Sequence, residues 1–389
     1  MNRYERYKDS GIPWLGEVPE HWDKIAIHYL VNLKSGDSIT ALDLVENGEY
    51  PVFGGGGFRG YINSFTHSGQ FNLIGRQGAL CGNVTLANGK FFATEHAIVV
   101  TPIKKLDTKW LYYLLITMNL NQYSTSAAQP GISAEVIGRL RVPFPNFKEQ
   151  TAIAHYLDTK LGEIDALIDK QQTLLEKLAE QRTAVITQAV TKGLNPAAPM
   201  KNSGVEWLGD VPAHWDVKRL KFLAKIQNGA DYKHIEANEG YPVIGSGGQF
   251  AYASCYLYKG ESVLLGRKGT IDKPLYINGS FWTVDTMYYT EIFKNTYPKF
   301  LYYLTLTVDF ERYSTQTALP SMTQMALNNL TFVIPDYEEQ TTIADYLDQE
   351  TAKIDRLCDT VNQTIGRLKE YRTALITQAV TGKIKVTDE

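Results

Sequence analysis

Two long segments of the chain carry apolar residues at seven-residue spacing among mostly polar positions. Such a repeat, sustained over many turns, is typical of a helix that packs against another helix in a coiled coil. At about 1.5 Å per residue, each segment predicts a helix roughly 65 Å long, and the other segment is its expected partner. Two ordinary amphipathic helices in one bundle would also explain the stripe, but not the matched lengths and endings. The predicted seam residues are Leu157, Ile164, Leu178, Val185, Leu347, Ile354, Val361, Leu368 and Leu375.

Both segments begin with the same signals. A proline closes the preceding strand, the next residue offers a side-chain oxygen to the N–H groups of the first turn, and a glutamate follows three positions later. Both segments also end alike, on ITQAVTKG and ITQAVTGK. The starting residues are Pro145, Asn146 and Glu149 in the first copy and Pro335, Asp336 and Glu339 in the second.

The rest of the chain is duplicated as well. The segment DSGIPWLGEVPEHW (9–22) returns as NSGVEWLGDVPAHW (202–215), and LIGRQG (73–78) returns as LLGRKG (264–269). The 389 residues therefore divide into a globular domain (1–148), a long helix with a linker (149–195), a second globular domain (196–337) and a second long helix (338–389).

Each globular domain consists of short β-rich runs separated by turns. One short helix is expected over 110–118, after a capping Asp107. This pattern favours an α+β fold with a mostly antiparallel, irregular sheet. The two domains differ most over 34–49 and 228–240, which fits either two readers of different targets or neutral drift in surface loops.

The recurring Gly-Arg-x-Gly turn is the first candidate for ligand binding. Its glycines let the backbone approach a ligand closely, and Arg76 with Gln77, or Arg267 with Lys268, would project from its tip. In the major groove of DNA, Arg pairs with guanine and Gln with adenine through two hydrogen bonds each. A hairpin turn whose charges are merely solvated is the alternative, and both interpretations stay open.

Hydroxyl-rich segments near 123–129 and 313–316 suit contacts to phosphate that set register, although turn and cap roles would use the same residues. The glycines at 54–57 lack the ending of a P-loop, but a loop of this kind could touch phosphate. The further candidates for DNA contact are Arg59, Ser124, Gln129, Ser314 and Gln316.

Charge and missing motifs restrict the function. Net charge is −3, with 14 basic and 12 acidic residues in 1–148 and 13 and 12 in 196–335, so the chain alone should bind DNA weakly. The sequence holds no GxSxG, HExxH, Walker A or Asn-Pro-Pro-aromatic motif, and we assign no catalytic residue. Its three distant cysteines predict neither a disulfide nor a metal site, and no apolar run approaches bilayer length, so a soluble cytoplasmic protein is expected.

The order domain–helix–domain–helix resembles the specificity (S) subunit of type I restriction-modification systems. The WLGEVPEHW opening, the Glu-Gln helix starts and the ITQAVTxG helix ends carry this resemblance across nearly the whole chain. It implies that each globular domain is a target recognition domain for one half of a split, asymmetric site in double-stranded DNA. It also implies that the helices set the spacing and bind two modification (methyltransferase) subunits. Restriction (translocase and endonuclease) subunits complete the complex, and S-adenosylmethionine, Mg²⁺ and ATP are then expected on the partner subunits, with no cofactor here.

Antiparallel pairing of two equivalent helices would create a pseudo-twofold axis through their middle. The two domains would then meet the duplex with the same polarity relative to their own half-sites, as in paired DNA readers. A coiled-coil scaffold with two protein-binding domains is the alternative function, and the weak basic balance is its best support. A free-standing methyltransferase would need a cofactor-binding motif that the sequence lacks.

Overall fold

The computed structural model of the chain describes residues 3–12, 14–125, 130–314 and 320–386. Two compact units interleave along the sequence: unit 1 comprises 1–171 and 363–389, and unit 2 comprises 172–362. Both internal boundaries fall inside long helices. Each unit therefore contains one globular domain, the start of the long helix that follows it and the end of the other long helix.

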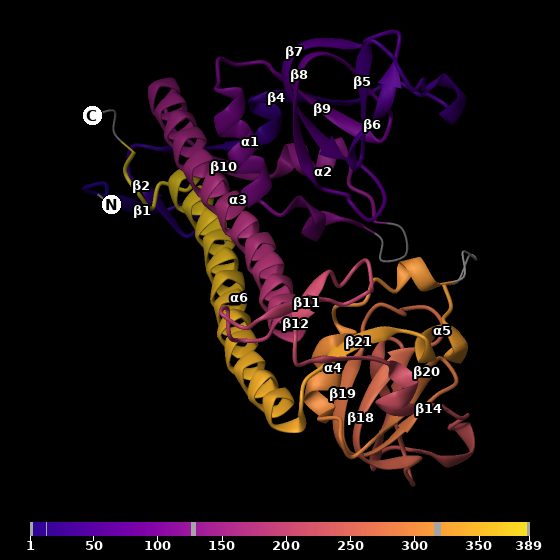
Figure 1. Cartoon of the computed structure of the whole chain (residues 1–389). Coiled ribbons are helices and arrows are strands. Elements are labelled where there is room, and N and C mark those ends of the chain that lie inside the picture. Colours follow the sequence, from indigo (N-terminus) through magenta and orange to yellow (C-terminus); the bar gives the residue numbers. More distant parts are fainter. Residues whose placement is uncertain (1–2, 13, 126–129, 315–319, 387–389) are drawn as a thin grey trace. The chain divides into compact units, whose positions relative to one another are not determined.

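In the described residues, unit 1 is built on a six-stranded mixed sheet (Figure 1). Its order is β4 (Val31–Ser35), β9 (Ala97–Pro102), β7 (His67–Gly75), β8 (Val84–Ala93), β5 (Tyr50–Gly54) and β6 (Gly57–Ile62). All neighbours are antiparallel except β5 and β8, as the mostly antiparallel prediction requires. The central strands are longer than their apolar runs, because the ladder continues through a polar stretch where Gly69 faces Gly89.

Unit 2 repeats this arrangement with one more edge strand among its described residues. The order is β14 (Ala224–Asn228), β20 (Met287–Ile292), β18 (Tyr258–Gly266), β19 (Leu275–Thr283), β16 (Tyr241–Gly245), β17 (Gly248–Ala253) and β15 (Glu236–Ala237). The parallel pair is again in the equivalent place, β16 with β19, and Gly260 faces Gly279 in the long hairpin. The duplication in the sequence is therefore a duplication of topology.

Short strand pairs and helices complete each unit. Asp107 caps the short helix α1 (Thr108–Thr117) as predicted, since its carboxylate accepts hydrogen bonds from the N–H groups of Lys109 and Trp110. The strand pairs are β1 (Tyr7–Asp9) with β2 (Glu17–Pro19), β3 (Asp23–Ala26) with β10 (Arg141–Phe144), β11 (Met200–Asn202) with β12 (Asp210–Pro212), and β13 (Asp216–Arg219) with β21 (Thr331–Ile334). The short helices are α1 (Thr108–Thr117), α2 (Ala134–Arg139), α4 (Pro298–Thr305) and α5 (Gln324–Asn328).

The two seven-residue patterns form unbroken helices, α3 (Phe147–Lys192) and α6 (Tyr337–Val380). The predicted caps are present: the N–H of Glu149 donates to Asn146 Oδ1 at 3.0 Å, and that of Glu339 donates to Asp336 Oδ1 at 2.9 Å. α3 begins two residues before the predicted start, because the helix starts directly after its cap.

Most predicted seam residues are buried in their units, and only Val185 and Leu368 are half-buried. An ion pair joins the two helices within each unit. In unit 1 Arg372 Nε lies 2.9 Å from Asp165 Oδ1, and in unit 2 Arg182 Nε lies 3.5 Å from Asp355 Oδ1. Each unit thus contains a contact between a segment of α3 and a segment of α6.

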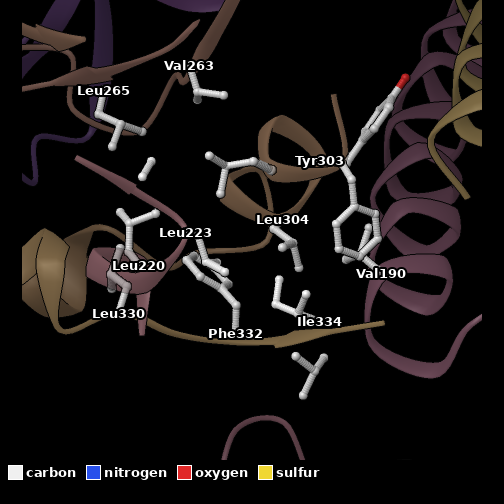
Figure 2. Packing of buried hydrophobic residues seen from close by; sticks show 14 of the residues in the cluster. Val190, Leu220, Leu223, Val263, Leu265, Tyr303, Leu304, Leu330, Phe332 and Ile334 are labelled. Carbon is white, nitrogen blue, oxygen red and sulfur yellow. The ribbon is translucent and has the colours of Figure 1, made fainter. Parts of the chain in front are cut away.

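The core of unit 2 shows how the end of α3 joins a globular domain (Figure 2). Trp215 and Phe300 are fully buried, with ring centroids 6.5 Å apart. Figure 2 shows Leu304 of α4 between Phe332 of β21 and Val190 of α3. All three residues belong to one buried cluster. The apolar ITQAV ending of the helix is therefore a docking sequence for the domain core.

The start of each long helix is tied to the Trp-containing opening of its domain. Glu149 Oε1 accepts a hydrogen bond from Trp22 Nε1 at 3.2 Å and lies 2.9 Å from His21 Nε2. In unit 2, Glu339 Oε2 makes the same two contacts, at 3.1 Å to Trp215 Nε1 and 2.8 Å to the His214 ring. The glutamate of the capping signal thus serves as a link between helix and domain.

The following glutamine makes a second link, and it is almost completely buried in both copies. Gln150 Oε1 accepts from the Asp107 N–H at 3.0 Å, and its Nε2 donates to Pro145 O at 2.8 Å. Gln340 accepts from the Tyr297 N–H at 2.8 Å and likewise donates to the preceding proline. The Glu-Gln pair therefore fixes the angle between each domain and its helix.

Candidate nucleic-acid interface

The Gly-Arg-x-Gly turn of unit 1 (75–78) is hydrogen-bonded to the loop that precedes α2. Gly78 N–H donates to Pro130 O at 3.0 Å, and Ile132 N–H donates to Arg76 O at 2.9 Å. Gln77 and Gly131 form an isolated β-bridge between them. Two segments that are distant in sequence therefore form one surface.

The glycine turn (54–57) packs against the Gly-Arg-x-Gly turn. A Cβ atom at Gly55 would lie 3.2 Å from the carbonyl oxygen of Gln77, and one at Gly54 would lie 2.5 Å from Arg59 Cδ. The closest approach is at Gly75, where a Cβ atom would lie 2.2 Å from the carbonyl oxygen of Gly55. Three predicted contact residues are thereby brought to one place, with Arg59, Arg76 and Gln77 all exposed.

In unit 2 the Gly-Arg-x-Gly turn (266–269) is hydrogen-bonded to the equivalent loop. Gly269 N–H donates to Pro320 O at 3.0 Å, and Met322 N–H donates to Arg267 O at 2.9 Å. Lys268 is exposed, while Arg267 is half-buried with its guanidinium 5.7 Å above the Tyr288 ring. The backbone frame is the same in both units, and the side chains displayed on it differ.

The structure places two of the residues predicted to contact phosphate, and their DNA contacts stay predictions. Ser124 ends a short 3-10 helix and precedes Thr125, whose N–H donates to Gly131 O at 3.0 Å, so Ser124 lies next to the same loop. Ser314 Oγ donates to Glu311 O at 3.0 Å, which is a local cap role. Gln129 and Gln316 lie outside the described residues and stay predictions.

Sequence reasoning missed the loops at 130–132 and 320–322 as partners of the turn, and it missed Ser35, whose Oγ accepts a hydrogen bond from Arg76 Nη1 at 3.3 Å. One signal was available. PGIS (130–133) returns as PSMT (320–323) at nearly the same distance from the Gly-Arg-x-Gly turn, so the two motifs recur together.

Two tyrosines with a strongly raised pKa, Tyr113 and Tyr303, lie where a short helix meets a long one. Burial, together with the Asp158 carboxylate that accepts its hydrogen bond at 2.7 Å, raises the pKa of Tyr113. Tyr303 has the same partner geometry with Asp348, and burial again raises its pKa. These groups hold α1 and α4 to the long helices.

Within the described ranges, no cluster of three or more His, Cys, Asp or Glu side chains is placed to hold a metal ion, and the three cysteines are unpaired. Among the helices of those same ranges, none is both long enough and apolar enough to cross a bilayer.

Comparison with known proteins gives one consistent result. The family model described as "Type I restriction modification DNA specificity domain" matches residues 19–177 and 212–367, once in each copy. The EcoprrI type I restriction enzyme specificity subunit of Escherichia coli is 36% identical over 46% of this chain and 42% of its own length. The EcoDI specificity subunit of Escherichia coli is 24% identical over 95% of this chain and 90% of its own length.

One solved structure, from work on complex assembly and conformational transition of the type I R-M system, has the same fold. It aligns with a TM-score of 0.74 at 14% identity and covers 94% of this chain and 99% of its own. Because the family match covers both copies and most of the chain, the duplicated turns belong to two equivalent domains of one family. The chain is a member of the type I restriction modification DNA specificity family.

Proposed function

We propose that this chain is the non-catalytic subunit that gives a type I restriction-modification complex its DNA sequence specificity, with each unit reading one half of a split site. The observation that carries the proposal is the pair of equivalent turn–loop frames, held by matching backbone hydrogen bonds, with different exposed side chains. Arg76 and Gln77 suit guanine and adenine, whereas Lys268 suits guanine or phosphate. Two different readers on one scaffold predict an asymmetric target.

The long helices are proposed to pair antiparallel as a coiled coil with a pseudo-twofold axis. The ion pairs support this. Asp165 of α3 corresponds in the repeat to Asp355 of α6, and Arg182 corresponds to Arg372. The contacts Asp165–Arg372 and Asp355–Arg182 therefore exchange into each other when the two helices are exchanged, as in an isologous interface.

The helix ends support the same arrangement. In unit 1 Lys383, just after α6, donates to Glu17 O, and Tyr7 Oη donates to Gly382 O at 3.0 Å. In unit 2 Lys192, at the end of α3, donates to Leu208 O at 3.0 Å. Each domain opening thus receives the end of the long helix from the other copy.

The helices are further proposed to bind two modification subunits, which would carry S-adenosylmethionine, while restriction subunits would carry Mg²⁺ and ATP. The scaffold function without DNA is not favoured, because the matched family is one of DNA specificity domains. In the assembled complex the partner subunits would supply much of the phosphate neutralisation that this chain, at net charge −3, does not.

The test is methylome sequencing of a host that carries the chain with its modification subunits. We expect one split, asymmetric motif, methylated once in each half on opposite strands. The substitution Gln77→Ala should change the bases recognised in one half of the motif only, and Lys268→Ala those in the other half only. A continuous motif, or no methylation that depends on this chain, would overturn the proposal.

The spacing role has its own test. Seven residues inserted after Gln172 in α3 and seven after Asn362 in α6, which are equivalent positions, add two helical turns to both helices. At about 1.5 Å per residue the domains move apart by roughly 10 Å, or about three base pairs. Both half-sites should stay unchanged while the gap between them grows. A change in the half-sites would contradict the spacing role.

A further inference from the structure

The two units differ at one position beside the Gly-Arg-x-Gly turn. The residue two places after the turn is Leu80 in unit 1 and Ile271 in unit 2. Leu80 is 48% exposed, whereas Ile271 is 4% exposed and belongs to the core of unit 2. The two loops differ in conformation, because a Cβ atom at Gly75 would lie 2.6 Å from Leu80 O, whereas one at the equivalent Gly266 would lie 2.5 Å from Thr270 O. Ile271 therefore takes the inward place that Cys81 has in unit 1, and the exposed Leu80 has no apolar counterpart among the described residues of unit 2.

The loop that carries Leu80 is held rigidly by hydrogen bonds. Gly75 N–H donates to Asn83 O and Gly82 N–H donates to Gly75 O, both at 2.8 Å. The next residue, Cys81, is fully buried, and its carbonyl accepts a hydrogen bond from Asn121 Nδ2 at 2.8 Å. Cys81 is buried, and these hydrogen bonds hold the loop on either side of it. The side chain of the preceding residue, Leu80, is therefore exposed.

Leu80 lies beside the predicted base-reading residues. A Cβ atom at Gly56 would lie 2.9 Å from Leu80 Cδ1, and one at the neighbouring Gly55 would lie 3.2 Å from Gln77 O. Leu80 and Gln77 therefore border consecutive residues of the glycine turn. In unit 2 the space over Gly247, the equivalent of Gly56, contains no described atom within 4 Å of such a Cβ.

We propose that Leu80 is a specificity-determining residue that contacts the C5-methyl group of a thymine in the half-site read by unit 1. The thymine methyl is the apolar group that the major groove presents next to base-edge donors and acceptors, and apolar side chains recognise it. Its position next to Arg76 and Gln77 places Leu80 at the same groove edge. This inference rests on the proposed function, since it requires unit 1 to face DNA bases.

The test uses the complex with its modification subunits and the target duplex defined by methylome sequencing. Each thymine of the target is replaced in turn by deoxyuridine, which removes only the methyl group, and dissociation constants are measured at fixed salt. With the wild-type chain, one replacement should weaken binding about fourfold, the factor expected for one buried methyl group.

Three variants make the result specific. With Leu80→Ala the same replacement should have no effect, while Leu80→Met should keep the effect because its side chain is still apolar and long. Ile103→Ala is the matched control, since Ile103 is 60% exposed in unit 1 but lies next to Leu30, away from the turn. It should behave as the wild type.

The outcomes separate the two proposals. If the wild-type complex shows no sequence-specific DNA binding, the proposed function and this inference are overturned together. Specific binding in which no thymine couples to Leu80, or a target half without thymine, overturns only the inference. If Leu80→Ala instead lowers the amount of modification subunit bound, Leu80 faces a protein and the inference is also wrong.

Discussion

The buried glutamine at the start of each long helix allows a quantitative test of how domain and helix are joined. Gln150→Leu keeps the side-chain size but leaves the Asp107 N–H and the Pro145 carbonyl without their partner. Each buried polar group left unsatisfied costs about 1–3 kcal/mol, so unit 1 should lose about 2–6 kcal/mol of its unfolding free energy. That loss is large against a typical domain stability of about 5–15 kcal/mol.

The measurement is denaturant unfolding of the full chain, with hydrogen exchange at the Asp107 amide to locate the effect. Gln172→Leu is the control, because Gln172 is exposed on the same helix, and it should change stability by less than about 0.5 kcal/mol. Gln340→Leu should cost more than Gln150→Leu, since Gln340 also donates to Asn295 O at 3.1 Å. Equal stability of the Gln150 and Gln172 variants, with protection kept at Asp107, would refute the reasoning.

Three further predictions follow from the contacts. Charge reversal of Asp165→Arg should destabilise the chain, and adding Arg372→Asp should recover about 0.5 kcal/mol in a double-mutant cycle, because the pair is partly exposed. The pKa of Tyr303 is raised, so its stabilisation is complete below about pH 10, the ordinary tyrosine pKa, and is lost as pH rises above it. Tyr303→Phe should therefore flatten the alkaline decline in unfolding free energy. Gly75→Ala would place a Cβ atom 2.2 Å from Gly55 O, so specific DNA binding should fall while modification subunits still bind in pull-down.

The sequence predicted the long helices well because their signals are local and repeated. The caps at Asn146 and Asp336 and the seven-residue stripe both depend on residues within a few turns of one another. For the globular domains, the sequence predicted the α+β class and the apolar part of each strand, but not the full length of the strands. Their strands continue through polar and glycine-rich stretches such as Gly69 opposite Gly89, where pairing is decided by the partner strand.

The candidate site shows the same division between local and distant information. The Gly-Arg-x-Gly turn was found because it recurs. In unit 1 its first glycine, Gly75, is required by the close approach of Gly55, and its second, Gly78, has a positive φ of 87°. Its pairing with residues 130–132 depends on hydrogen bonds between segments that no local pattern relates. The exposure of Leu80 depends on the burial of Cys81 beside it. In the other unit Ile271 stands at the corresponding sequence position but is buried, because that loop has another conformation.

The two copies share the residues that join helix to domain, and they differ in the side chains that the turn exposes. The residues that link helix to domain, Glu149 with Gln150 and Glu339 with Gln340, make nearly the same hydrogen bonds in both units. The turn keeps its backbone frame, but its exposed side chains differ. Because the links lie at the helix starts and the variation lies at the turn tips, a change of target bases need not alter the angle of a domain on its helix. Under the proposed function, an exchange of loops or of a whole domain should therefore change the target bases without a change in the distance between the half-sites.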